Sequence, residues 1–277
     1  MPTVSPSPNG PMGTRGRPRD HDGRMPDRPL TPDEYWSLPA AVGSMDRGRA
    51  PAHYEDLLLA DAVSLAGAPD AIRTVHVLGV GAGRELPAVR RAAPTARILA
   101  WDVAPGMVEA CRRNLDGAGL GEVEVAARAA GDLAPDDGRA QLVVGLNAVL
   151  GYVVPAAERR RTVAALAAVL EPGGVLAAVV QQRRGRPDWA AWFLAHDALA
   201  AAHLIGSAPG DRWIGDDGPT VAHHHYTRRE LVDLLAGAGI EPTRVGSLRR
   251  FVGPHGIRPP LRSPNPLVAL AVRRSSS

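Results

Sequence analysis

The stretch Thr74-Val75-His76-Val77-Leu78-Gly79-Val80-Gly81-Ala82-Gly83-Arg84 takes an apolar strand into a turn with glycine at every second position. Glycine accepts positive φ and has no Cβ, so such a turn lets the backbone approach a ligand closely. Residues 85–93 have a helical pattern, and the N-terminus of that helix would face the same ligand. The stretch therefore predicts a ligand site where a strand meets a helix.

The spacing of these glycines does not fit a pyrophosphate site. The dinucleotide fingerprint is G-x-G-x-x-G, but the sixth position is Arg84 when counted from Gly79 and Leu86 when counted from Gly81. The pattern present, G-x-G-x-G, resembles motif I of the class I S-adenosylmethionine-dependent methyltransferases. The resemblance implies S-adenosylmethionine as cofactor, with Gly79, Gly81 and Gly83 beside its amino-acid end.

A carboxylate follows the second predicted strand at the spacing of the same family. The apolar run 96–101 ends on Asp102, nineteen residues after Gly83. An acid at this strand end accepts hydrogen bonds from the ribose hydroxyls. The resemblance implies this role for Asp102, with Val103 next to it in the cofactor site.

Two further segments resemble later motifs of the family. Asp132 and Leu133 correspond to the acid that contacts the adenine amino group and its apolar neighbour against the ring, although a plain turn carboxylate is the alternative for Asp132. Asn147 ends the fourth strand, and the loop after it flanks the sulfonium in the family. The resemblance thus makes Asn147 a cofactor contact and Tyr152 a residue that orients the acceptor.

One family position is missing here. Many members carry an acid two residues before the first glycine, where it helps to hold the ammonium group of the cofactor, and this chain has Val77. That contact must come from elsewhere. Arg84 has two interpretations: a bidentate contact to the cofactor carboxylate, or a solvated arginine at a helix start.

Strands alternate with helices along residues 71–277, which favours a mostly parallel α/β sheet covered on both faces. With the resemblance, we expect a Rossmann-like three-layer sandwich of seven strands, the last one antiparallel. Residues 1–30 are rich in Pro, Gly and Arg and are predicted to be a disordered tail. Residues 31–70 are predicted to form a helical cap that starts at the capping box Thr31-Pro32-Asp33-Glu34.

Residues 181–226, after the fifth strand, exceed the usual connection of about two to six residues. Insertions of this kind often determine substrate specificity. Residues 187–205 have a helical pattern with Trp189, Phe193 and His196 near one face. Beyond them lies the run 223–225 of three histidines, of which at most two can serve one site, because side chains in an extended or helical segment cannot all point one way.

Three uses of the histidines stay open. A metal site would need a further ligand such as Asp211, Asp216 or Asp217, and the spacing matches no recognised ligand motif, so no metal is predicted. A general base for a hydroxyl or amine is chemically reasonable, because imidazole titrates near neutrality. The third use is structural. The candidates for the base are His196, His223, His224 and His225.

Composition excludes several classes of protein. The chain has no lysine and 32 arginines, which rules out Walker-type phosphate loops, lysine Schiff bases and pyridoxal phosphate enzymes. A net charge of +3 and 4% aromatic residues argue against a nucleic-acid partner. Cys111 is the single cysteine, which suggests a reducing cytoplasm. No apolar run reaches the roughly 18 to 20 residues of a membrane span. A homodimer is left open.

The resemblance implies a methyltransferase that acts on an oxygen or nitrogen of a small molecule such as a secondary metabolite. Two alternatives share the fold. One is attack at another carbon of the cofactor, by aminocarboxypropyl transfer or cyclisation, and both reactions release methylthioadenosine. The missing acid at Val77 leaves this alternative open, because that position holds the amino-acid end of the cofactor in the family. The other is a non-catalytic protein that binds S-adenosylmethionine. A nicotinamide-dependent dehydrogenase comes last because of the glycine spacing.

Overall fold

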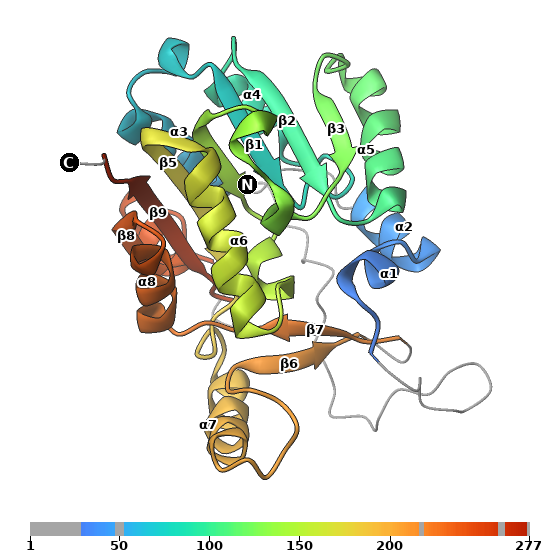
Figure 1. Ribbon diagram of the computed structural model, residues 1–277, viewed down its shortest axis with the longest axis vertical. Coiled ribbons are helices and arrows are strands. Elements are labelled where there is room, and N and C mark those ends of the chain that lie inside the picture. The colour runs from blue at the N-terminus through green and yellow to red at the C-terminus, as the bar shows by residue number, and fades with distance from the viewer. Residues whose placement is uncertain (1–28, 48–52, 216–218, 260–263, 276–277) are drawn as a thin grey trace.

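A computed structural model describes residues 29–47, 53–215, 219–259 and 264–275. Its central sheet has seven strands in the order β3-β2-β1-β4-β5-β9-β8 (Figure 1). Strand β9 is antiparallel to both of its neighbours, and the other pairs are parallel. This confirms the predicted mostly parallel sheet with an antiparallel last strand. The strands are β1 (Thr74–Leu78), β2 (Arg97–Asp102), β3 (Glu124–Ala127), β4 (Ala140–Gly145), β5 (Leu170–Val180), β8 (Ile240–Ser247) and β9 (Leu267–Arg273).

Helices cover both faces of the sheet, which makes the three predicted layers (Figure 1). One face packs against α3 (His53–Ala66), α4 (Leu86–Ala92), α5 (Pro105–Ala118) and α9 (Leu248–Val252). The other packs against α6 (Ala156–Val169) and α8 (Arg228–Gly237). Short 3-10 turns complete the connections: η1 (Pro69–Ala71), η2 (Ala130–Asp132), η3 (Pro135–Asp137), η4 (Val149–Tyr152) and η5 (Gly253–His255).

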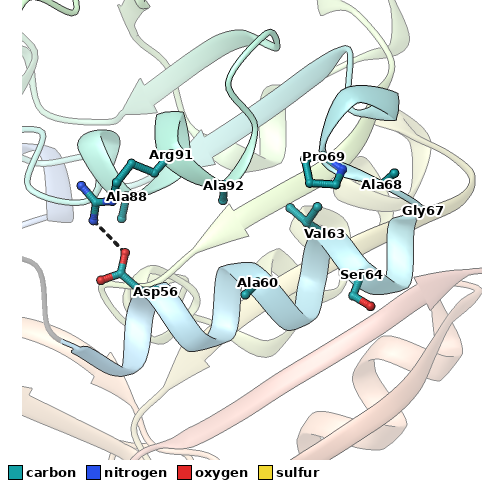
Figure 2. A pocket seen from close by; sticks show the side chains of 10 residues that line it. All are labelled: Asp56, Ala60, Val63, Ser64, Gly67, Ala68, Pro69, Ala88, Arg91 and Ala92. Atoms are coloured by element: carbon teal, nitrogen blue, oxygen red, sulfur yellow. Dashed lines mark hydrogen bonds and ion pairs between the residues drawn. The ribbon is translucent and has the colours of Figure 1, made fainter.

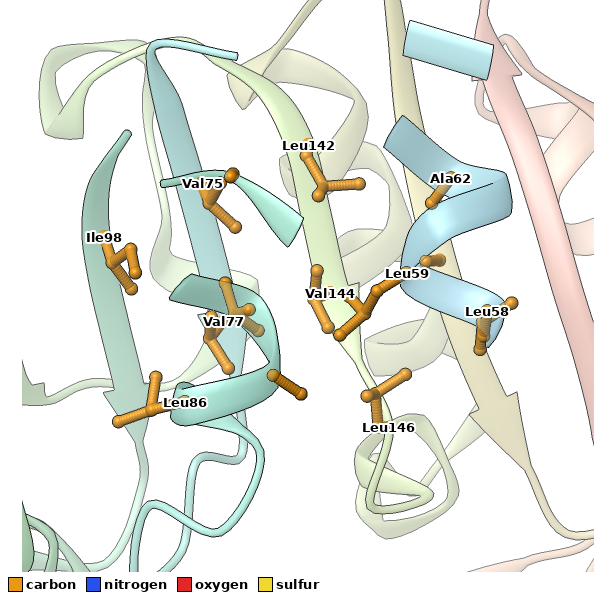
Figure 3. Packing of buried hydrophobic residues seen from close by; sticks show 14 of the residues in the cluster. Leu58, Leu59, Ala62, Val75, Val77, Leu86, Ile98, Leu142, Val144 and Leu146 are labelled. Atoms are coloured by element: carbon orange, nitrogen blue, oxygen red, sulfur yellow. The ribbon is translucent and has the colours of Figure 1, made fainter. Parts of the chain in front are cut away.

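Residues that alternate along a strand supply the two cores in turn. In β1 the side chains of Val75 and Val77 join the core under α3 and α4 (Figure 3). The Leu78 side chain joins the core under α6. Leu58 and Leu59 of α3 are completely buried against the first core. Because both faces are dry, the carboxyl edge of the sheet is where polar groups can meet a ligand.

The predicted cap begins as expected. The backbone N–H of Thr31 donates to the Glu34 carboxylate at 2.9 Å, and the capping box starts α1 (Pro32–Trp36), which is followed by α2 (Pro39–Arg47). Residues 1–28 of the predicted tail lie outside the described residues. Its last residue, Leu30, was expected to be disordered, but its N–H donates to the Thr220 carbonyl at 2.8 Å, so ordered pairing begins before the predicted boundary.

The insertion after β5 contains more than the predicted helix. Helix α7 (Pro187–Ala201) ends four residues before the expected end at residue 205. It is followed by an antiparallel ribbon of β6 (Asp211–Ile214) and β7 (Val221–His224), which the sequence analysis did not predict. Figure 1 shows the ribbon beyond the carboxyl edge of the parallel strands, on the same side as α1 and α2. Within the part of the chain that the structure describes, no helix has the length and apolar character to cross a membrane.

Candidate functional site

The glycine turn after β1 has the backbone that only glycine adopts easily. The φ angles of Gly79, Gly81 and Gly83 are +59°, +52° and +86°. A Cβ on Gly79 would lie 2.7 Å from a methyl carbon of Val149, and a Cβ on Gly83 would lie 2.9 Å from the Cys111 sulfur. These positions therefore require glycine for both conformation and space.

Asp102 holds this turn in place. Its Oδ2 accepts a hydrogen bond from the N–H of Gly81 at 2.8 Å, and its Oδ1 accepts one from the N–H of Ala104 at 2.9 Å. Burial raises the pKa of the Asp102 carboxyl, and the backbone N–H groups of Ala104, Gly81 and Val103 oppose this rise. A carboxylate offers about four lone-pair sites, so at least one remains for a ligand. The ribose contact stays a prediction.

Arg84 is already paired inside the chain. Its guanidinium donates to both carboxylate oxygens of Glu55 in α3, at 2.9 and 2.5 Å, and to Oδ1 of Asn147 at 2.7 Å. The Glu55 side chain is completely buried. The sequence analysis considered a solvated arginine or a cofactor contact, and it had no signal for Glu55, which lies 29 residues away in the chain.

Glu85 is a buried acid that the sequence analysis missed. Its Oε1 accepts a hydrogen bond from Asn147 Nδ2 at 3.1 Å. Its Oε2 has no hydrogen-bond partner among the described residues. Burial raises the pKa of Glu85 to about 7, although the Arg84 guanidinium acts against this rise. Two carboxylates, Glu55 and Glu85, thus share one guanidinium at the carboxyl edge of β1 and β4.

The predicted adenine residues lie at the edge of the sheet. Asp132 forms a 2.9 Å ion pair with Arg161 of α6, and its side chain is 56% exposed. Leu133 is buried in the core under α6. Val103 is partly exposed directly after β2. The structure therefore places all three near the end of β2 and β3 without testing their roles toward a ligand.

The cap covers the glycine turn. The methyl carbon of Met45 in α2 would lie 3.4 Å from a Cβ on Gly81. Asp46 of the same helix accepts a hydrogen bond from Asn114 Nδ2 at 2.9 Å, and Asn114 also donates to the Ala82 carbonyl within the turn. Trp36 of α1 meets Tyr152 edge-on, with 5.3 Å between ring centroids. The helices therefore shield this edge of the sheet from water.

The three consecutive histidines point to two sides, as their alternation predicted. Both ring nitrogens of His224 bind carboxylates: Nδ1 lies 2.6 Å from Asp211 Oδ1, and Nε2 lies 2.7 Å from Glu230 Oε1. His196 is also engaged, with Nε2 2.9 Å from the Ser207 hydroxyl and Nδ1 3.4 Å from Asp197. In this conformation neither ring has a nitrogen available to an acceptor.

His223 and His225 lie on the other side and contact each other, with ring centroids 5.0 Å apart. Tyr152 meets His223 edge-on at 4.6 Å. Nδ1 of His223 and both ring nitrogens of His225 are buried without hydrogen-bond partners in the described ranges. Burial lowers the pKa of His223 to about 3 and that of His225 to about 2, so both rings are neutral at pH 7.

Other features do not form a competing site. A groove of about 450 Å³ between α3 and α4 has alanine and glycine at half of its lining positions, with the Asp56–Arg91 ion pair at one end (Figure 2). Among the residues that the structure describes, no three His, Cys, Asp or Glu side chains are placed to hold a metal ion. Asp216 and Asp217, considered as ligands above, lie outside the described residues.

Comparisons with known proteins agree with this geometry. Residues 75–174 match the family model described as a methyltransferase domain. No curated protein sequence matches the chain. A SAM-dependent methyltransferase from Methanosarcina mazei has a TM-score of 0.59 at 20% identity, over 75% of this chain and 94% of that one. The 1,6-didemethyltoxoflavin-N1-methyltransferase of Burkholderia thailandensis has a TM-score of 0.55 at 20% identity, over 90% and 94%. Magnesium protoporphyrin IX methyltransferase of Synechocystis PCC 6803 has a TM-score of 0.54 at 13% identity, over 88% and 95%.

Proposed function

We propose that this chain is a class I S-adenosylmethionine-dependent methyltransferase and that it methylates an oxygen or nitrogen of a small organic acceptor. The match of residues 75–174 to a methyltransferase domain and the similar fold of solved methyltransferases support the proposal. One observation carries the proposal. His223 and His225 have buried neutral imidazoles with nitrogens that lack partners among the described residues. The His223 ring lies against the loop that follows Asn147, and the His225 ring contacts His223. These imidazoles and a cofactor turn thus meet at one edge of the sheet.

The residues at the turn fit S-adenosylmethionine. The close backbone of Gly79, Gly81 and Gly83 suits a ligand that lies against it, and the Asp102 carboxylate has at least one lone pair left for the ribose hydroxyls. Asp132, Leu133 and Val103 remain the candidates for the adenine end. The roles of these residues are part of the proposal.

We propose that Glu85 contacts the ammonium group of the cofactor. It would take the role of the acid that many family members carry at the position of Val77. Glu85 Oε2 is buried and without a partner among the described residues, and the cluster holds two carboxylates for one guanidinium. A ligand cation would satisfy both the hydrogen bonding and the charge. Arg84 then acts through Glu55 and Asn147 and holds them in position.

The bound cofactor supplies a methyl group that its sulfonium already activates. The remaining work falls to the protein, which must orient the nucleophile, keep water out and take up the proton that the nucleophile loses. Met45 and Trp36 of the cap exclude water at this edge. The neutral imidazole of His223 or His225 can accept a hydrogen bond from the nucleophile and orient it. With pKa values of about 3 and about 2, neither ring keeps the proton at pH 7. Tyr152 lies between the cap and His223 and positions the acceptor.

A small acceptor suits the enclosure of the site. His223, His225 and Tyr152 are shut in between α1, the loop after β4 and α7. Two of the similar structures are named for methylation of a toxoflavin precursor and of magnesium protoporphyrin IX, both of them small molecules. The low identity makes these names a guide to the acceptor's size only.

Calorimetric titration tests the cofactor assignment. We expect binding of S-adenosylmethionine and S-adenosylhomocysteine but not of NAD, and chromatography afterwards should recover S-adenosylmethionine intact when no acceptor is present. Methylthioadenosine formed faster than in an enzyme-free control would show attack at another carbon. Binding of NAD alone would contradict the proposed function.

A further inference from the structure

His225 presents buried hydrogen-bonding atoms that the fold does not use. Its side chain is 1% exposed, and neither Nδ1 nor Nε2 has a partner among the described residues. The Gln182 backbone lies near the ring but outside hydrogen-bond geometry. A neutral imidazole carries one N–H donor and one acceptor nitrogen, so one donor and one acceptor of the ring are without partners. Buried polar groups in native proteins are nearly always paired, and an exception calls for a ligand or water.

Aromatic rings surround these atoms. Trp189 meets the His225 ring edge-on at 5.0 Å, and Phe193 lies at 4.9 Å. On the other side His223 and then Tyr152 continue the array at 5.0 and 4.6 Å. Ring centroids about 4.5 to 7 Å apart are the preferred spacing of aromatic pairs. We call Tyr152, Trp189, Phe193, His223 and His225 the ring cluster.

The ring cluster lies next to the cofactor edge. A Cβ on Gly151 would lie 2.3 Å from His223 ring atoms, so this ring rests directly on the loop after Asn147. The Ala148 backbone in the same loop is within hydrogen-bonding reach of the His223 ring. A ligand of the ring cluster would therefore sit beside the segment that carries Asn147.

Charged groups of both signs lie near the ring cluster: Asp211 acts on the pKa of His223 and Asp188 on that of Arg212, whereas arginines lie on the Trp189 ring. The Arg212 guanidinium of β6 lies 5.5 Å from the Trp189 ring centroid and 5.6 Å from that of Trp192. A positive neighbour disfavours a cationic ligand and favours one whose hydroxyl or ring N–H is acidic. Arg183 donates to the His225 carbonyl at 3.0 Å, which fixes the backbone without using the ring.

From this arrangement we infer that the ring cluster is the acceptor site and that its acceptor is a planar aromatic compound with an acidic hydroxyl or ring N–H. His225 binds that group through its open nitrogens, and the aromatic walls accept the flat ring. The inference rests on the proposed function and narrows its substrate class.

The first experiment compares neighbouring histidines by thermal unfolding at pH 8. A buried polar group without a partner destabilises the fold, so an apolar side chain of similar shape should stabilise it. We expect His225→Phe, or the smaller His225→Leu if phenylalanine is too large, to raise Tm by about 3 °C or more. The matched variant His224→Phe should lower Tm, because it breaks contacts to Asp211 and Glu230. If both His225 variants lower Tm, the imidazole has a structural role and the inference is overturned.

The second experiment measures binding of 2-naphthol and of its saturated counterpart decahydro-2-naphthol by ligand-observed NMR, with S-adenosylhomocysteine present. We expect 2-naphthol to bind, the saturated alcohol to bind at least tenfold more weakly, and His225→Phe to weaken 2-naphthol binding about tenfold, as for one lost hydrogen bond. Equal binding of the two probes, no binding of 2-naphthol, or no effect of the variant would overturn the inference. If the wild-type protein binds S-adenosylhomocysteine but neither probe, the inference is overturned and the proposed function stands. If the wild-type protein does not bind S-adenosylhomocysteine, the proposed function itself is contradicted.

Discussion

The cofactor end and the acceptor end of the site differ in how far the chain completes its own hydrogen bonds. At the cofactor end Asp102 accepts two backbone N–H groups, and Arg84 is paired with Glu55 and Asn147. At the acceptor end three buried ring nitrogens of His223 and His225 have no partner in the described chain. In the proposed site the glycine turn and the Arg84 pairing are formed before any ligand arrives, and Glu85 Oε2 is the atom at that end left without a partner among the described residues. The acceptor end depends more on the ligand to complete its hydrogen bonds.

The contrast agrees with what each end has to recognise. A cofactor shared by many enzymes can be held by a turn whose geometry the backbone fixes, because glycine and a strand-end acid suffice. An acceptor is specific to one enzyme and is selected by groups that are costly to leave unpaired, since a molecule without the right atoms leaves them unsatisfied.

Protonation of the two histidines at the acceptor end should have the largest effect. Unfolded histidine protonates near pH 6.5, whereas folded His223 and His225 have pKa values of about 3 and about 2. Between these values the unfolded chain binds more protons, so stability falls as the pH falls below 6.5. At pH 5 we expect the two rings to contribute a loss of about 2 kcal/mol each relative to pH 8, about 4 kcal/mol together. Glu85, whose folded pKa of about 7 lies above its unfolded value, offsets about 2.5 kcal/mol of this loss as it takes up a proton in the folded state. Urea unfolding at both pH values measures the net loss.

The control for that titration is His225→Phe. The variant keeps the other titratable groups, and its loss between pH 8 and pH 5 should be smaller than that of the wild type by about 2 kcal/mol. The same pH dependence in both proteins would mean that His225 is already protonated in the folded state, against the neutral ring assigned here.

His224→Ala should cause the next largest effect, although it lies in the same run of histidines. The ring joins Asp211 of β6 to Glu230 of α8, and its removal leaves two partly buried carboxylates with fewer partners. We expect a loss of about 3 kcal/mol in the free energy of unfolding. Exposed His255 is the matched control, with an expected change from His255→Ala within about 0.5 kcal/mol. A loss for His224→Ala no larger than this would refute its anchoring role.

At the cofactor end, Asp102→Ala should weaken binding of S-adenosylhomocysteine by about 1.5 to 3 kcal/mol, the contribution of hydrogen bonds to a charged group. Asp132→Ala provides the comparison with an exposed acid of the predicted cofactor site. Because Asp132 is exposed and paired with Arg161, we expect a loss of at most about 1 kcal/mol. Calorimetry measures both, with circular dichroism as the check of folding. Unchanged affinity in folded Asp102→Ala would remove the ribose assignment.

Glu85→Gln should have a smaller effect than Asp102→Ala, a loss of about tenfold in cofactor affinity, or about 1.4 kcal/mol. Its pKa of about 7 means that Glu85 holds a proton at pH 6 in the free protein. A ligand ammonium beside it favours the ionised form, so binding should release close to one proton. Titrations in phosphate and in Tris, which differ in ionisation enthalpy, reveal that proton. If the wild type and Glu85→Gln release the same number of protons on binding, the released proton comes from another group.

The sequence predicted the cofactor end better than the acceptor end for a physical reason. The turn Gly79–Gly83 and the strand-end position of Asp102 are local features, fixed by a few neighbouring residues and by the alternation of strands and helices. The parallel sheet then brings the strand ends together without further information. The seven-stranded topology with antiparallel β9 was expected from the resemblance to the methyltransferase family, because local features predict only a mostly parallel sheet.

Long-range pairing could not be read from the sequence. Glu55 meets Arg84 only because α3 packs on the sheet, and no periodicity signals a contact of that kind. The four-residue strands β6 and β7 are too short for a clear alternation, so the ribbon that separates His224 from His223 and His225 was missed. The alternation rule limited a shared site to two of the three histidines, and the packing then showed which two lie together.

A crystal structure with S-adenosylhomocysteine would test the contrast between the two ends most directly. We expect the ligand on the turn at Gly79–Gly83, with ribose oxygens at Asp102, the amino group at Glu85, and the ring cluster on the side where the methyl group would be. Ligand density in the groove between α3 and α4, or at the turn but away from both acids, would contradict the assignment of the site.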